Sequence, residues 1–173
     1  MSSDVRLDEA GRCMTAGLSS LRRYAHALIR DRGVADDLVQ DTLDRAWTRI
    51  ASWQAGSDMR PWLFSIMHNL HVDQLRRHAP VTVPLDDEAL AVSVRGTHHD
   101  HLELRDLDAA LRRLPDEQRE VLLLIALEEM SYAEAASVLG ISPGNVASRL
   151  SRAREKLRTV LEEQRKTSLK VVR

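Results

Sequence analysis

Two segments in which apolar residues recur with the period of an α-helix are separated by a stretch that lacks this period. The intervening residues 78–103 contain two prolines and a glycine and show no sustained 3.6-residue repeat. Such a stretch interrupts helices and connects folded units. We therefore predict an all-α fold of two small helical domains, residues 1–80 and 104–173, joined by a flexible linker over residues 81–103.

Several classes of protein are excluded by simple counts. The single cysteine, Cys13, rules out an internal disulfide framework and a four-cysteine zinc site. The longest apolar run, Val121–Leu127, is far shorter than the roughly 20 residues that cross a bilayer. The first residues lack a basic region followed by an apolar one, which is the pattern of a secretory signal. We expect a cytoplasmic protein with no direct membrane insertion.

The formal net charge of −1 hides an uneven distribution. Taken as an average, near-neutrality argues against a protein that binds nucleic acid. Within residues 145–158, however, only Glu155 opposes the basic side chains of Arg149, Arg152, Arg154, Lys156 and Arg158. The chain therefore carries a strongly basic helix near its C-terminus, of the kind that attracts phosphates.

A helix predicted over about residues 34–53 has an apolar and an acidic side. The apolar side carries Val39, Leu43, Ala46, Trp47 and Ile50. The other side carries Asp36, Asp37, Gln40, Asp41 and Asp44. These acids could be a solvated face that favours the helix N-terminus, but the complete stripe favours docking of a basic partner. Parallel exposed carboxylates on one helix do not converge as a metal or acid–base site requires.

The next helix is predicted over about residues 59–78, with Asp58 as its cap and Pro61 in its first turn. Its apolar stripe is Leu63, Ile66, Met67 and Leu70. The remaining positions are mostly basic or amide side chains: Arg60, His68, Asn69, His71, Arg76, Arg77 and His78. With nearby aromatic residues, this composition suits unpaired nucleic acid. We expect Trp47 and Trp62 in the core, while Trp53 fits either the core or a stacking surface.

The C-terminal segment has the pattern of a helix-turn-helix. Residues 131–134 form a capping box, Gly140 suits the turn, and Ser142 with Pro143 suits the start of a second helix. The spacing of Ala136, Gly140 and Val146 is typical of two helices in close contact. The exposed face of the second helix would present Asn145, Ser148, Arg149 and Arg152. That face favours DNA contact, and the alternative is a helical hairpin of a protein adaptor.

In their order, these segments resemble the bacterial extracytoplasmic-function sigma factors over about residues 15–78 and 104–163. The sequence Asp36-Asp37-Leu-Val-Gln40-Asp41 is similar to the motif with which this family binds the clamp coiled coil of core RNA polymerase. Residues 60–77 resemble the segment that opens and reads the promoter minus-10 element. Residues 114–122 and 131–154 resemble the domain that binds the minus-35 element.

The resemblance implies two sets of promoter contacts. For the minus-10 element they are Trp53, Arg60, Ile66, His68, Asn69, Asp73, Arg76 and Arg77. For the minus-35 element they are Gly144, Asn145, Ser148, Arg149, Ser151, Arg152 and Arg154. It also implies that Trp53, Ile66 and Asn69 surround a base flipped from the non-template strand. Ser65 and Ala147 stand where many family members carry basic residues, which puts one contact in doubt at each position.

The resemblance further implies an inhibitory anti-sigma factor as a partner. We expect no cofactor, no metal and no enzymatic activity, because no nucleophile triad, phosphate-binding loop or zinc signature is present. His98, His99 and His101 could bind a metal, but an incidental cluster is the simpler interpretation. A conventional helix-turn-helix regulator that does not associate with core polymerase is the alternative function, and a protein adaptor is a third.

Overall fold

The chain folds into helices throughout the part that the computed structural model describes, residues 3–78 and 100–171, with side chains described for residues 7–77 and 106–164. The elements are α1 (Ser3–Leu28), α2 (Arg32–Thr48), the 3-10 turn η1 (Ile50–Ser52), α3 (Met59–His78), α4 (Asp100–Arg112), α5 (Asp116–Ala126), α6 (Tyr132–Leu139) and α7 (Pro143–Val171). These residues contain no strand, which confirms the predicted all-α class. None of these helices has the length and hydrophobicity to cross a membrane.

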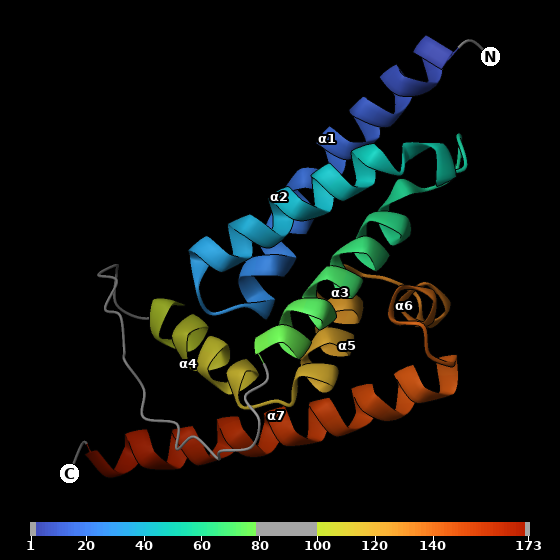
Figure 1. Cartoon of the computed structure of the whole chain (residues 1–173). Helices are drawn as coiled ribbons and strands as arrows, with labels where there is room; N and C mark the ends of the chain where they lie inside the picture. The colour runs from blue at the N-terminus through green and yellow to red at the C-terminus, as the bar shows by residue number, and fades with distance from the viewer. Residues whose placement is uncertain (1–2, 79–99, 172–173) are drawn as a thin grey trace.

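The N-terminal half consists of α1, α2 and α3, with α2 lying beside both others (Figure 1). Its core is made by large side chains that are almost fully buried, among them Leu21, Tyr24 and Leu38. The ring of Tyr24 meets that of Phe64 edge-on, with centroids 5.1 Å apart. This geometry suits the ring quadrupoles and joins α1 to α3 in the core.

Helix α2 ends earlier than the sequence pattern predicts. Asp31 caps its start by accepting a hydrogen bond from the backbone N–H of Val34, at 3.0 Å. The helix ends at Thr48 and continues as η1. The expectation that Trp47 lies in the core is wrong, because its side chain is 51% exposed. Its neighbour Ala46 takes the inward position, and one residue is a rotation of about 100° around a helix.

The C-terminal half contains the predicted helix-turn-helix. Ser131 and Glu134 form the reciprocal capping box at the start of α6. Gly140 ends that helix with φ +64°, a left-handed conformation that glycine adopts without strain. The hydroxyl of Ser142 accepts a hydrogen bond from the N–H of Asn145 at 3.2 Å, and Pro143 opens α7 as predicted. Helix α7 extends along one side of the molecule (Figure 1).

The two halves pack against each other. Helix α3 contacts α6, and α1 contacts α5. The buried apolar residues form one cluster that runs from Ala10 in α1 to Ala153 in α7. Residues 81–99 of the proposed linker, with His98 and His99 of the histidine cluster, lie outside the described residues, as does the side chain of His101. Residues 100–103, which the linker was predicted to include, form the first turn of α4 instead. The domain boundaries therefore stay a prediction.

Candidate polymerase and nucleic-acid interfaces

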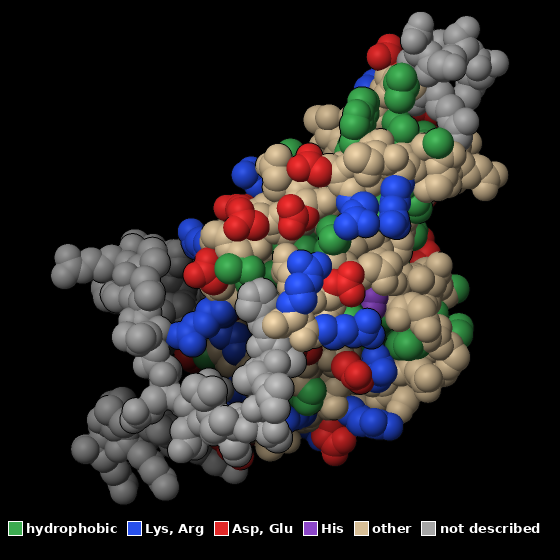
Figure 2. Space-filling view, in the orientation of Figure 1, with side chains coloured by type: hydrophobic (Ala, Val, Ile, Leu, Met, Phe, Trp, Pro, Cys, Tyr) green, Lys and Arg blue, Asp and Glu red, His purple; other side chains and the backbone are tan. Residues whose placement is uncertain are grey.

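The acidic side of α2 is open to solvent over most of its length. Asp37, Gln40, Asp41 and Asp44 are exposed. Asp36 is different, because its Oδ1 lies 3.0 Å from His26 Nε2 and 3.7 Å from Arg22 Nε, both on α1. The hydrogen bond from His26 lowers the pKa of Asp36. Figure 2 shows acidic side chains following the line of α2. The side chain of Asp36 is nevertheless 49% exposed, so all five residues of the predicted stripe are accessible and Asp36 alone is engaged by α1.

The C-terminal half of α3 presents polar groups to solvent. Asn69 is exposed, and its amide donates a hydrogen bond to the backbone carbonyl of Ser65 at 2.8 Å. Arg76 and Asp73 form a loose ion pair of 4.0 Å, with side chains 77% and 55% exposed. Arg77 is also exposed. Exposed pairs of this kind contribute little to stability, so these side chains remain available for a ligand.

The N-terminal half of α3 and the turn before it are largely buried. Trp53 is 2% exposed and Ile66 is 7% exposed, so these two side chains lie in the core. Arg60 is partly buried, and it is one of the charges that lower the pKa of Glu134 in α6. The Nδ1 of His68 lies 2.9 Å from Glu120 Oε1 in α5. Of the eight residues that the resemblance assigns to the minus-10 element, these four do not form an open surface with Asn69, Asp73, Arg76 and Arg77.

His71, which the sequence places among the basic positions of α3, is 5% exposed. Neither of its ring nitrogens has a hydrogen-bond partner among the described residues. Burial lowers its pKa, partly offset by the nearby carboxylates of Glu120 and Asp116. This side chain is therefore a neutral group in the contact between α3 and α5.

The exposed face of α7 fits the predicted minus-35 contacts. Gly144, Asn145, Ser151, Arg152 and Arg154 are exposed, whereas Ser148 and Arg149 are half-buried. A hydrogen bond of 3.0 Å joins the Arg152 guanidinium to the Ser148 hydroxyl.

A second arginine on this face is held by α5. The Nη2 of Arg149 lies 2.9 Å from Glu117 Oε2. On the opposite face, Val146 and Leu150 are buried against the rest of the domain. The helix is thus anchored by its apolar side and presents polar groups outward, as major-groove recognition requires.

Two glutamates of the contact between the halves were not singled out in the sequence. Glu128, which follows α5, has a side chain with 0% exposure, and Arg23 of α1 donates three hydrogen bonds of 2.9, 3.0 and 3.1 Å to it. Glu120 is 5% exposed and faces His68. For Glu120 a signal was present, because it lies four residues before the buried Leu124 on the same face of α5. Glu128 lies beyond the end of that helix, and the helical period gives no signal for it.

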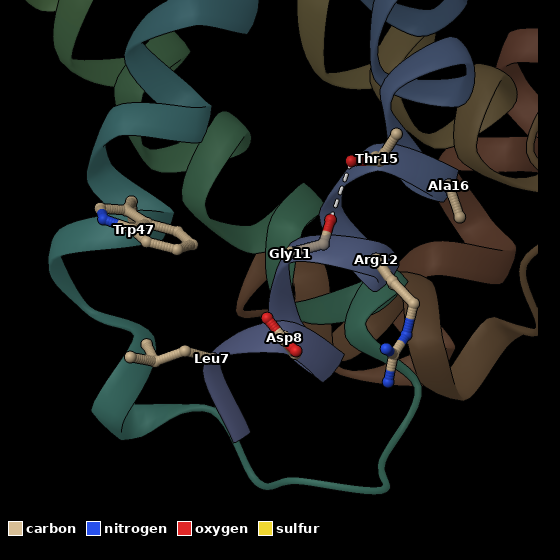
Figure 3. A pocket seen from close by; sticks show the side chains of 7 residues that line it. All are labelled: Leu7, Asp8, Gly11, Arg12, Thr15, Ala16 and Trp47. Carbon is tan, nitrogen blue, oxygen red and sulfur yellow. Dashed lines mark hydrogen bonds between the residues drawn. The ribbon is translucent and has the colours of Figure 1, made fainter. Parts of the chain in front are cut away.

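An open groove of about 670 Å³ lies between the outer end of α1 and α2. In Figure 3, Leu7 and Trp47 face this groove from opposite helices, and Thr15 bonds back to the carbonyl of Gly11 within α1. The exposed Trp47 is therefore part of the groove's wall, opposite Leu7 and Gly11 of α1.

Two family models match the chain. "Sigma-70, region 4" matches residues 104–157, and "Sigma2 domain of PhyR" matches residues 14–68. The first contains α5, α6 and the basic part of α7. The second contains α2 and the first half of α3.

Curated relatives match most of the chain. It is 39% identical over 147 residues to "ECF RNA polymerase sigma factor EcfG" of Rhodopseudomonas palustris, covering 84% of this chain and 81% of that protein. It is 32% identical to "ECF RNA polymerase sigma factor SigM" of Bacillus subtilis, covering 83% and 89% respectively.

Solved structures give the same picture. The sigma factor RpoE of Bartonella quintana, crystallised with the anti-sigma factor NepR, has a TM-score of 0.71 and 34% identity, covering 86% of this chain and 94% of that one. CnrH in complex with the cytosolic domain of CnrY has a TM-score of 0.67 and 31% identity, covering 89% and 88% respectively.

Proposed function

Since the chain belongs to the extracytoplasmic-function (ECF) RNA polymerase sigma factors, we propose that separate surfaces on α2, α3 and α7 make its polymerase and promoter contacts. It directs promoter-specific transcription initiation as a subunit of the polymerase. The observation that carries the proposal is the exposed polar face of α7 on a helix-turn-helix within the region 4 match. We assign the polymerase and minus-10 contacts to the domain of residues 1–80, and the minus-35 contacts to the domain of residues 104–173.

The polymerase contact is proposed for the acidic surface of α2, namely Asp36, Asp37, Gln40, Asp41 and Asp44. Exposed carboxylates in a row complement a basic partner and speed its association. Asp36 supports this surface from its edge, since α1 engages it through His26. The partner would be the clamp coiled coil of core RNA polymerase.

The minus-35 contact is proposed for the N-terminal part of α7. Asn145, Ser148 and Arg149 would face base edges near the start of the helix, where major-groove readers make base contacts. Gly144, Ser151, Arg152 and Arg154 would lie against the phosphates on either side. Arg149 would have to leave Glu117 to take this role.

The minus-10 contact is proposed for α3. Asn69, Asp73, Arg76 and Arg77 are accessible to a single strand in this structure. His68 and Arg60 would join them once Glu120 of α5 and Glu134 of α6 move away. Trp53 and Ile66 are buried and would have to become exposed to take part. Trp53, Ile66 and Asn69 are proposed to surround the flipped base.

An anti-sigma factor is the proposed inhibitory partner. RpoE, which this chain resembles along most of its length, was solved in complex with the anti-sigma factor NepR. We further propose that the protein acts in the cytoplasm, where the polymerase is, and that it performs no chemistry on the DNA itself.

Run-off transcription with purified core polymerase and a library of genomic promoter fragments tests this function. We expect promoter-dependent transcripts from the wild-type chain and none from the Asp37→Lys/Asp41→Lys variant, which reverses charge on the polymerase surface. Glu162→Lys is the matched control, because Glu162 is an exposed acid on α7 away from α2. Absence of any promoter-dependent transcript with the wild-type chain would reject the proposal.

A conventional helix-turn-helix regulator is not favoured, because the relatives that cover both halves of the chain are ECF sigma factors. That alternative predicts tight operator binding by the free chain and no affinity for core polymerase.

A further inference from the structure

Two arginines near the end of α2 do not belong to its acidic stripe. Arg45 and Arg49 are both exposed, and neither guanidinium has a hydrogen bond or an ion pair among the described residues. Asp41 lies one turn before Arg45, in the order that favours an ion pair, and the two still do not pair in the described structure. Two accessible cations without a counter-charge are therefore available to an external anion.

Helix geometry gives the direction of these side chains. Nine residues separate Asp36 from Arg45, which is about two and a half turns, so the two lie on opposite sides of α2. Asp36 faces α1, where it meets His26. Arg45 therefore points away from α1. Arg49 follows one turn later, about 6 Å further along the axis, on nearly the same side.

This side of α2 adjoins α3. The two helices pack against each other, and Figure 2 shows basic side chains between the acidic line of α2 and the surface over α3. Arg49 also directly precedes η1, the turn that leads toward α3. The accessible residues of the proposed minus-10 contact, among them Asn69 and Arg76, lie on α3. A strand bound across α3 thus has a second set of cations beside it on α2.

The chemistry of the pair fits phosphate groups. A guanidinium keeps its charge at physiological pH and offers several N–H donors to phosphate oxygens. Two exposed cations one helical turn apart can follow the backbone of a strand, and contacts of this kind position nucleic acid without reading its sequence. The acidic stripe on another side of the same helix repels that backbone, which confines the strand to the side of Arg45 and Arg49.

We propose that Arg45 and Arg49 bind the phosphates of the opened promoter strand beside α3, so that α2 contacts polymerase on one side and single-stranded DNA on another. This inference deepens the proposed minus-10 contact and rests on that role of α3. The pair adds a site for any sequence next to a helix that reads a particular one. It holds the opened strand whichever bases follow the minus-10 element.

The salt dependence of single-strand binding tests this phosphate site. Fluorescence anisotropy measures binding of the full chain to a 20-nucleotide strand of thymidines from about 50 to 200 mM NaCl. Arg45→Ala/Arg49→Ala should weaken binding and make the slope of log K against log salt shallower by about 1.4, at about 0.7 for each lost phosphate contact. The affinity ratio of wild type to variant should then fall about sevenfold over this range. An unchanged slope would overturn the site.

A matched control shows whether the effect is local. Arg12→Ala/Arg32→Ala removes the same charge from two exposed arginines on the α1 side, since Arg12 lines the groove and Arg32 lies one turn before Asp36. This variant should keep the wild-type slope. An equal change in both double variants would reflect net charge alone and would overturn the site.

A second variant and a second strand identify the ligand group. Arg45→Lys/Arg49→Lys keeps both charges and should retain the wild-type slope, because lysine binds phosphate as a point charge. A strand of adenosines should show the same loss with Arg45→Ala/Arg49→Ala as the thymidine strand, because phosphates carry no sequence information. A shallower slope in the lysine variant, or a loss confined to one strand, would contradict phosphate binding.

Affinity for core polymerase separates this site from a protein contact. Arg45→Ala/Arg49→Ala should bind core polymerase as the wild type does. If the variant loses core affinity and keeps its single-strand affinity, the pair contacts protein and the phosphate site is wrong. Single-strand binding by the free chain does not involve polymerase, so failure of run-off transcription would reject the proposed function alone. Absence of wild-type binding to both strands at 50 mM NaCl would overturn the phosphate site alone.

Discussion

The two helices proposed to contact DNA, α3 and α7, have similar polar faces but different surroundings. The polar face of α7 is open at Asn145 and Arg152, while Arg149 is paired with Glu117 of α5. On α3, the equivalent basic and amide positions are open toward the C-terminal end and covered toward the other, where His68 meets Glu120. Composition identifies a helix that suits DNA, but the packing of the other half decides how much of it is available.

The largest expected effect is on stability, at Trp53 between η1 and α3. Because Trp53 is 2% exposed, Trp53→Ala should lower the free energy of unfolding by about 3–5 kcal/mol. Trp47→Ala is the matched control, since Trp47 is 51% exposed and its loss leaves no closed cavity. Urea denaturation measures both. Equal stability of the two variants would mean that Trp53 is not buried in solution.

The second prediction concerns DNA binding by the free chain. Arg149→Ala/Arg152→Ala should weaken binding to a minus-35 duplex by about 2–6 kcal/mol, since each contact of this kind contributes about 1–3 kcal/mol. Arg76→Ala/Arg77→Ala removes the same charge from α3 and should leave duplex affinity almost unchanged, while reducing run-off transcription. Fluorescence anisotropy measures the affinities. A comparable loss from both pairs would erase the contrast between the helices.

A smaller effect is expected at the capping box that starts α6, the helix that contacts both α3 and α7. Ser131→Ala removes the hydroxyl that accepts from the N–H of Glu134 and should lower stability by about 1 kcal/mol. Ser131→Asp keeps an acceptor at the cap and should retain most of the stability. Thermal denaturation distinguishes them, and the cap would be unimportant if Ser131→Ala melted with the wild type.

The smallest expected effect is a pH dependence at the contact of α3 with α5. Burial holds the pKa of His71 below its ordinary value of 6.5. Below pH 6.5 the unfolded chain therefore binds a proton on this ring more readily than the folded chain, so stability falls as the pH is lowered from 7.5 to 5.5. Glu120, Asp116, Arg119 and His68 act on the same ring and set the size of the effect.

The variant His71→Leu isolates this ring. Its melting temperature should fall less between pH 7.5 and 5.5 than that of the wild type. The carboxyls of Asp36 and Glu134, whose pKa values are lowered, begin to lose their contribution only below about their ordinary values of 3.8 and 4.5. They do not interfere in this window. Identical slopes for the two proteins would show that His71 is not buried in the contact.

Local pattern predicted most of the fold. The capping box at Ser131, the left-handed Gly140 and the start of α7 at Pro143 were all predicted, because each depends on a few adjacent residues. The position of Trp47 was predicted wrongly. A one-residue step around a helix decides between core and surface, and a wide apolar stripe does not resolve it.

The contact between the halves could not be predicted in the same way. Arg23 and Glu128 are 105 residues apart, and the local sequence around either residue does not indicate that the two form a pair. Glu128 follows directly after an apolar run, and the sequence is equally consistent with a carboxylate exposed to solvent at that position. Only the folded arrangement shows that Glu120 and Glu128 are buried and that Ile66 and Trp53 lie in the core.

The separation of Arg23 and Glu128 also has a consequence for synthesis of the chain. At about 5–20 residues per second, a ribosome needs roughly 5–20 s to translate the 105 residues between them. During that interval α1, α2 and α3 have no C-terminal half to cover them, and the nascent chain presents His68 and Arg60 uncovered. Each newly made molecule therefore passes through a brief stage in which the contact between Arg23 and Glu128 has not formed. This stage can end only after Glu128 leaves the exit tunnel.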